Sequence, residues 1–149
     1  MARLVLDDFI PYRLSVTSNL VSDAIARTYE ALFGLSIPEW RLIAVTAEQD
    51  GATQAAIGAR TRMDKVTVSR AAIALVGRGL LARTAHADKR SHGLTLTAAG
   101  RELYAQIAPK ALELERRIFA GFERAEIAQF EGLLRRVAEA TLALSDRQR

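Results

Sequence analysis

The sequence predicts a mainly α-helical protein with a small β-hairpin wing, in which a winged helix-turn-helix core is flanked by N- and C-terminal helices. Residues 53–97 give the first indication, because they read in order as two short helices joined by a tight turn, a strand, a basic loop and a second strand. The second indication is that apolar residues on both sides of this segment recur at spacings of three and four, which is the period of amphipathic helices.

Charge is concentrated in the same segment. Between residues 60 and 90 there are eight basic side chains against two acidic ones, a net charge of +6, whereas the whole chain carries +4. The remainder of the chain is therefore mildly acidic. A localised basic surface on such a protein is typical of nucleic-acid binding, and we expect double-stranded DNA as the partner.

Length and composition limit the other possibilities. The 149 residues fit a single domain, and half of them are hydrophobic, as in ordinary globular proteins. Because the chain has no cysteine and only two histidines, we expect no disulfide, no metal site and no cofactor. Asp7 and Asp8 interrupt the early apolar stretch, and no run approaches the roughly 18 apolar residues of a membrane span. A cytoplasmic protein without membrane contact is expected.

A long first helix is expected from Asp7 or Asp8 to Phe33, where the apolar residues form one stripe. Pro11 is tolerated in its first turn, where no intrahelical amide donor is needed. Gly34 is suited to the left-handed conformation that commonly ends a helix.

A second helix is expected to begin after Ser36, which can cap it, and to end at Asp50-Gly51. Pro38 would lie in its first turn. The residues expected to face inward are Trp40, Leu42, Ile43, Val45 and Thr46.

The helix-turn-helix follows. Thr53 is a plausible cap for the first of its helices, about Gln54 to Thr61, in which Gly58 would permit a close helix crossing. After a tight turn, Asp64 is a good cap for the recognition helix, residues 65–78.

The recognition helix has two distinct faces. Val68, Ala72, Leu75 and Val76 are expected to pack inward. The opposite face carries the candidate DNA contacts, which are Lys65, Val66, Thr67, Ser69 and Arg70, with Ile73 as a further candidate and Thr53 and Gln54 on the preceding helix. Arginine can bond guanine bidentately, hydroxyls reach base edges or phosphates, and valine can meet a thymine methyl group. The alternative is a solvated amphipathic helix without a ligand.

The wing is expected to consist of strands at 80–83 and 93–96 joined by a loop at 84–92. This loop contains Asp88, Lys89 and Arg90. A carboxylate two residues before an arginine can orient its guanidinium, which then suits the narrow, negative minor groove. The alternative is an ordinary charged hairpin tip.

Two more helices follow the wing. Thr97 is expected to cap one that runs to about Phe119, with Pro109 kinking or breaking it, and the last spans about 124–144. Neither terminal helix has enough neighbours in a chain of this length to bury its apolar face. We therefore expect a homodimer with interleaved terminal helices, which also suits pseudo-palindromic DNA with half-sites about one helical turn apart.

Residues 53–103 resemble the MarR (multiple antibiotic resistance regulator) family of transcription factors. The resemblance is carried by MDKVTVSR at 63–70, RGLLAR at 78–83, DKR at 88–90 and LTLTAAGREL at 94–103. With the flanking helices it extends over nearly the whole chain, 1–149. It implies a DNA-binding lobe at 36–98, dimerisation helices at 1–35 and 99–149, and a repressor released by a small, often aromatic, anionic ligand.

The resemblance also implies residue roles. Arg90 would enter the minor groove with Asp88 as its orienting partner, and residues 66, 67, 69 and 70 would face the major groove. The chain departs from the family at Gly58 and Thr61, where alanine and leucine are usual, so this helix is expected to pack less tightly.

An effector site is expected between the dimerisation helices and the DNA-binding lobe, where the family has its pocket. The candidate residues are Tyr12, Arg13, Trp40 and Arg41, which offer rings for stacking and guanidiniums for a carboxylate. The alternative assigns Trp40 to the core and the two arginines to the surface.

The sequence bears on two other classes of function. The chain has no Gly-rich phosphate loop, no paired carboxylates on a cleft-forming element and no nucleophile–base pattern, so we do not expect an enzyme. A winged helix used as a protein-interaction module is the main alternative. It would have no need for Lys65, Arg70 and Arg90 together.

Overall fold

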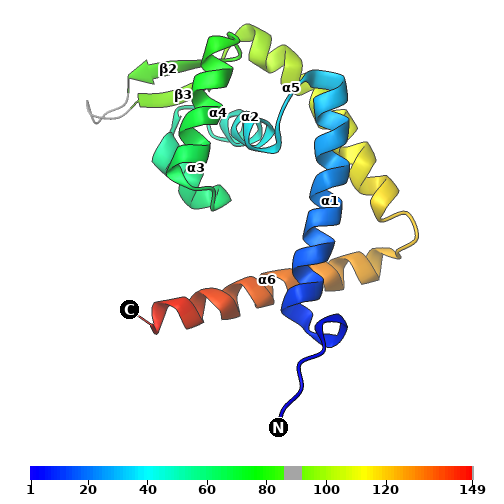
Figure 1. The fold of residues 1–149 in the computed structure, drawn as a ribbon. Helices are drawn as coiled ribbons and strands as arrows, with labels where there is room; N and C mark the ends of the chain where they lie inside the picture. Colours follow the sequence, from blue (N-terminus) through cyan, green and yellow to red (C-terminus); the bar gives the residue numbers. More distant parts are fainter. Residues whose placement is uncertain (86–91, 149) are drawn as a thin grey trace. The chain divides into compact units, whose positions relative to one another are not determined.

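The computed structural model describes residues 1–85 and 92–148, and Figure 1 shows its ribbon. The chain forms two compact units, Met1–Ala111 and Leu112–Arg149, and each is described by itself. In chain order, the described elements are the 3-10 turn η1 (Leu6–Asp8), α1 (Ile10–Phe33), α2 (Ile37–Glu48), β1 (Ala52–Thr53), α3 (Gln54–Thr61), α4 (Lys65–Gly77), β2 (Leu81–Ala85), β3 (His92–Leu96), α5 (Ala98–Ile118) and α6 (Arg124–Asp146). The expected fold class, mainly helical with a small antiparallel sheet, is confirmed.

The first helix begins later than expected. Asp7 and Asp8 belong to the 3-10 turn, and α1 starts at Ile10. Pro11 accounts for this start, because proline lacks an N–H, is favoured in the first turn and restricts the residue before it. At the other end Gly34 adopts a left-handed conformation, with φ of +62°, as the sequence predicted.

The start of α2 is fixed by a capping box. The Glu39 N–H donates to Ser36 Oγ over 3.3 Å, and the Ser36 N–H donates to Glu39 Oε1 over 3.0 Å. Of the residues expected to face inward, Trp40 is half-buried and the other four are buried.

The sheet contains a strand that the sequence did not predict. The strand order is β1-β3-β2, and the short β1 pairs antiparallel with β3, with Ala52 opposite Leu94. The β2–β3 hairpin is longer than expected, since its register runs from Leu81↔Leu96 to Ala85↔His92. Thr84, Ala85 and His92, which were expected in the loop, therefore belong to the strands, and residues 86–91 lie outside the described residues.

The core lies in the middle of the sequence. In the described residues, every buried apolar side chain lies between Tyr29 and Ile107. Here α2 packs against α4 and β3, and α3 packs against α4. These contacts hold the helix-turn-helix on the small sheet.

The start of α5 is packed against the end of the helix-turn-helix. Thr97 Oγ1 donates to the Gly79 carbonyl over 2.6 Å and accepts from the Gly100 N–H over 3.0 Å. A Cβ atom at Gly100 would overlap the Leu80 carbonyl oxygen. The L-T-x-x-G pattern at residues 96–100 therefore has a packing reason.

Pro109 does not break α5. The helix is continuous from Ala98 to Ile118, so the expectation of a break is wrong. One turn of helix tolerates the loss of a single backbone hydrogen bond when its neighbours are packed, and Ile107, two residues earlier, is fully buried. The boundary between the two compact units falls after Ala111, close to this proline.

The C-terminal unit has no buried side chain in its described part, residues 112–148. The Phe119 ring lies 5.6 Å from the Phe122 ring and 6.1 Å from the Phe130 ring, between centroids. This contact joins the end of α5 to α6, which continues two residues beyond the expected Leu144.

Candidate nucleic-acid interface

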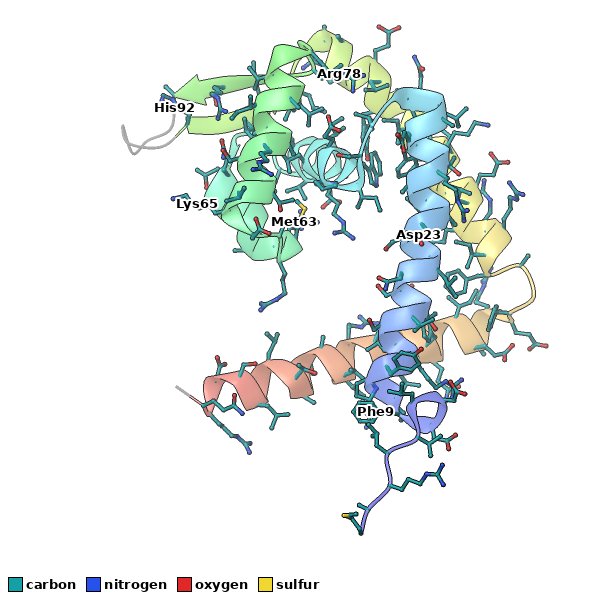
Figure 2. All side chains as sticks on the ribbon, in the orientation of Figure 1. Phe9, Asp23, Met63, Lys65, Arg78 and His92 are labelled. Carbon is teal, nitrogen blue, oxygen red and sulfur yellow. The ribbon has the colours of Figure 1, made fainter. Side chains whose placement is uncertain are left out.

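The turn of the helix-turn-helix is defined by local backbone geometry. After α3, Arg62 adopts a left-handed conformation with φ of +58°, and Asp64 then caps α4 by accepting the Thr67 N–H over 2.7 Å. Hydrogen bonds from Thr67, with smaller contributions from the Val66 N–H and then from the charge of Arg70, hold the pKa of Asp64 below its usual value. Figure 2 labels Met63 in this turn and Lys65 at the start of α4.

Helix α4 presents opposite faces to the core and to solvent. Val68, Ala71, Ala72 and Leu75 are buried, and Val76 is half-buried. The outward face contains Lys65, Val66, Arg70 and Ile73, all exposed, while Thr67 and Ser69 are half-buried. The expected division of this helix therefore agrees with the structure, and Ile73 lies fully on the outward face.

The start of α3 is tied to the base of the wing. Thr53 Oγ1 accepts the Ala56 N–H over 3.1 Å, as expected for a cap. Arg83 Nη1, on β2, donates to Gln54 Oε1 over 2.7 Å. Because this bond uses the oxygen of the Gln54 amide, the NH₂ group of Gln54 remains free to donate. The other N–H groups of the exposed Arg83 guanidinium lie beside it.

Sequence reasoning assigned Arg83 no role beyond the strand. Its only signal was membership of the basic cluster between residues 60 and 90. Its partner lies 29 residues earlier in the chain, so no local pattern links the two.

Two further basic residues of that cluster have structural partners. Arg60 pairs with Glu48 on α2. Arg78 donates to the Gly34 and Phe33 carbonyls over 3.1 and 3.3 Å, which caps the C-terminus of α1. The net charge of the segment therefore overstates the charge available to a ligand.

Other cations of the cluster remain available. In the described part of the chain, Arg62, Lys65 and Arg70 have no side-chain hydrogen bond or ion pair. The wing residues Asp88, Lys89 and Arg90 lie outside the described residues.

Gly58 lies close to the turn and to α4, as expected. A Cβ atom there would lie 3.4 Å from the Met63 carbonyl oxygen and 3.7 Å from Val68 Cγ2, which is ordinary van der Waals contact. An alanine would therefore fit at this position, whereas a larger side chain would meet these atoms. Thr61, the other departure, is half-buried and donates its hydroxyl to the Ile57 carbonyl over 2.7 Å.

The candidate effector residues do not converge within one chain. Trp40 lies in an aromatic cluster, with ring centroids 5.2 Å from Tyr29 and 6.2 Å from Tyr104. Burial raises the pKa of the Tyr29 hydroxyl. Tyr12 and Arg13 lie in the first turn of α1, about 25 Å from Tyr29 along the helix at 1.5 Å per residue.

No group of three or more metal-ligating side chains lies together among the described residues. None of the described helices is long and apolar enough to cross a membrane.

A helix-turn-helix with an exposed recognition helix and an adjoining β-hairpin defines the class of winged-helix DNA-binding proteins. Comparisons with known proteins give the family. The MarR family model matches residues 33–91. The chain belongs to the MarR family of transcriptional regulators, which are not enzymes.

Solved structures agree with this assignment over nearly the whole chain. A MarR/EmrR family transcriptional regulator from Acinetobacter sp. ADP1 is 27% identical, with a TM-score of 0.86, and the match covers 93% of this chain and 98% of that one. A probable transcriptional regulator from Pseudomonas aeruginosa is 30% identical, with a TM-score of 0.76 and coverage of 89% and 99%.

A third structure shares the fold at lower identity. It concerns BpsR from Bordetella bronchiseptica, whose DNA binding is regulated by 6-hydroxynicotinic acid. The identity is 22%, the TM-score is 0.83, and the match covers 92% of this chain and 98% of that one. A search of curated proteins found no match.

Proposed function

We propose that the protein is a homodimeric repressor that binds a pseudo-palindromic operator and releases it when a small aromatic or anionic molecule binds. The observation that carries this proposal is the outward face of α4. Lys65, Val66 and Arg70 are exposed there, directly opposite the buried Val68 and Leu75. A single helix with such a face fits the width of the major groove.

Each element has a distinct part in the proposed complex. Arg70 bonds a guanine, and the half-buried hydroxyls of Thr67 and Ser69 reach nearby base edges or phosphates. Gln54 and Arg83 together offer several N–H donors to one phosphate at the start of α3, where Thr53 is the cap. Asp88, Lys89 and Arg90 keep their proposed minor-groove role on the resemblance alone.

The proposed dimer rests on apolar side chains that have no cover. They lie in the first part of the chain and along α6, and they include Leu4, Phe9, Ile10, Leu14, Leu20, Phe130, Leu133, Leu134 and Val137. A monomer rarely leaves so many large apolar side chains exposed. A second copy would cover it, with 36–98 as the DNA-binding lobe and 1–35 and 99–149 as the dimerisation helices.

The proposed effector site is centred on Trp40. Its ring and those of Tyr29 and Tyr104 offer aromatic surface, and Arg41, the next residue on α2, is an exposed cation. An aromatic carboxylate matches this combination, and the regulation of the Bordetella protein by 6-hydroxynicotinic acid supports the same ligand class. Tyr12 and Arg13 would take part where a second copy brings them to this site.

Selection from a random duplex library, followed by titration of the winning sequence across salt concentrations, tests the proposal. An enriched palindrome, with affinity that falls steeply as salt rises, is expected of a dimeric sequence-specific regulator. Arg70→Ala should relax one base position and weaken binding about 5- to 150-fold, a cost of about 1–3 kcal/mol. Arg124→Ala removes the same charge in the C-terminal unit and is the matched control. No enrichment would favour the protein-interaction module instead.

Release by an effector is tested separately. Calorimetric titration with a panel of small aromatic carboxylates should identify a binder that also lowers affinity for the selected operator. Binding without an effect on DNA affinity would contradict ligand-dependent release. A reporter gene placed behind the operator then distinguishes repression from activation.

A further inference from the structure

We propose that Val66 and Ile73 read thymine methyl groups on the two sides of the base pair that Arg70 reads. Each half-site would then carry A·T pairs flanking a G·C pair. This inference rests on the proposed function and deepens it, because it names the base sequence that the recognition helix prefers.

The three side chains lie in one line along α4. They occupy positions i, i+4 and i+7 of a continuous helix, which places them on the same face. At 1.5 Å per residue, Val66 and Ile73 lie about 6 and 4.5 Å from Arg70 along the helix axis. Successive base pairs are about 3.4 Å apart, so both aliphatic side chains reach within about two base pairs of the one that Arg70 contacts.

The exposure of the two aliphatic side chains has no structural cause within the described chain. Val66 is 56% exposed and Ile73 is 62% exposed, although α4 also contributes four buried residues to the core. Both are β-branched, and β-branched residues are less favourable than alanine at exposed helix positions. Their stiff side chains would lose little conformational entropy on contact with a ligand.

The chemistry of the row formed by Val66, Arg70 and Ile73 indicates which surface it binds. The Arg70 guanidinium lies between two aliphatic side chains, Val66 and Ile73. A complementary surface has a pair of hydrogen-bond acceptors with a small apolar group on each side. The floor of the major groove provides it, because guanine offers O6 and N7 and thymine offers its C5 methyl group. Phosphates would gain nothing from Val66 or Ile73, and a second copy of this face would oppose Lys65 and Arg70 with like charges.

Deoxyuridine substitution tests the inference in the selected operator. Replacing one thymine by deoxyuridine removes only the methyl group and leaves base pairing intact. We expect one or two positions in each half-site to lose about fourfold in affinity, which corresponds to about 0.8 kcal/mol for one buried methyl group.

Truncated variants assign each methyl group to its side chain. Val66→Ala should abolish the sensitivity at one position and Ile73→Ala at another, which gives a double-mutant cycle between protein and DNA. Each variant is the control for the other, because Val66→Ala should retain the sensitivity assigned to Ile73, and Ile73→Ala should retain the sensitivity assigned to Val66. Both substitutions are at exposed helix positions, so circular dichroism should report unchanged folding.

The outcomes separate this inference from the proposed function. Specific binding that is insensitive to every deoxyuridine substitution would overturn the methyl readout and leave the regulator intact. Sensitivity that persists in both Val66→Ala and Ile73→Ala would overturn it as well. The absence of any specific binding would instead mean that the proposed function itself fails.

Discussion

Helices α4 and α6 are both amphipathic, yet they differ in what covers their apolar sides. In α4 the residues Val68, Ala71, Ala72 and Leu75 are buried, whereas α6 buries none of its residues. Both patterns follow the period of a helix, and only the first has its partner elements within the same compact unit. Periodicity therefore identifies the face of a helix that needs cover, and the covering element has to be found by other means.

The largest expected contrast is in the unfolding free energy when one methyl group is added at Gly100, beside the core, or at Gly132, on α6. Gly100→Ala places Cβ on the Leu80 carbonyl oxygen, where backbone cannot move aside cheaply, and should cost about 3 kcal/mol of unfolding free energy. Gly132→Ala makes the same change in α6, where no described atom beyond the helix's own backbone and the adjacent residues lies within 4 Å of the added methyl group, and should stabilise by about 0.5–1 kcal/mol. Urea denaturation of both variants measures this contrast. Similar effects at the two sites would contradict the packing described at Gly100.

A charge placed on α6 should disturb assembly. Leu134 is 41% exposed and lines a hollow of about 360 Å³ with Phe119 and Phe130. If a second copy covers this surface, Leu134→Glu should raise the dimer dissociation constant at least about tenfold, because an unpaired carboxylate would be desolvated. Analytical ultracentrifugation gives the constant, with Ile73→Glu on α4 as the control that leaves it unchanged. If the wild-type protein is a monomer, the proposal that a second copy covers α6 is wrong.

A smaller gain is expected inside the core. Thr46 is buried, and its hydroxyl has no hydrogen-bond partner in the described part of the chain. Thr46→Val replaces that hydroxyl with a methyl group and should stabilise the protein by about 1 kcal/mol. Thr141→Val is the control on α6, where an exposed hydroxyl donates to the Val137 carbonyl over 2.7 Å. Thermal denaturation in which Thr46→Val is the less stable variant would show that this hydroxyl is satisfied in solution.

The smallest expected effect concerns the unfolding free energy at acidic pH. The pKa of Asp64 is lower in the folded chain than in the unfolded one, because Thr67 donates to its carboxylate and Arg70 adds a smaller attraction. Its contribution is therefore present above the unfolded value of about 3.9 and is lost as pH falls through the folded pKa. Asp64→Asn keeps a side chain that can cap the helix but has no carboxyl group to titrate. The unfolding free energy of the wild type should therefore fall relative to that of Asp64→Asn between about pH 5 and pH 2. If the denaturation midpoints of Asp64→Asn and of the wild type change equally over this pH range, the Asp64 carboxylate makes no contribution to the pH dependence of stability.

The features predicted well from the sequence are local ones. Ser36, Thr53, Asp64 and Thr97 mark the helix starts because a cap bonds an amide only three residues away. The two faces of α4 were predicted for a similar reason, since residues on one face of a helix recur every three or four positions. In both cases the interacting groups lie within one short window of sequence.

The features missed depend on contacts between distant segments. Strand β1 has only two residues, and its pairing with β3 spans about forty positions, so no periodicity could reveal it. The link from Arg83 to Gln54 and the use of Arg78 as a cap for α1 also join separate elements. Of the kink or break expected at Pro109, the break is wrong, because the sequence rule considers the lost hydrogen bond and not the packing around the proline.

The single tryptophan of the chain gives the two regions different optical reporters. Trp40 lies between Tyr29 and Tyr104 inside the unit that has its own core, whereas α6 contains no tryptophan. Indole emission therefore follows the melting of the DNA-binding part, while far-ultraviolet ellipticity also counts the helical C-terminal unit. If the two signals melt at separate temperatures, the chain unfolds in steps, and a single transition temperature cannot describe it.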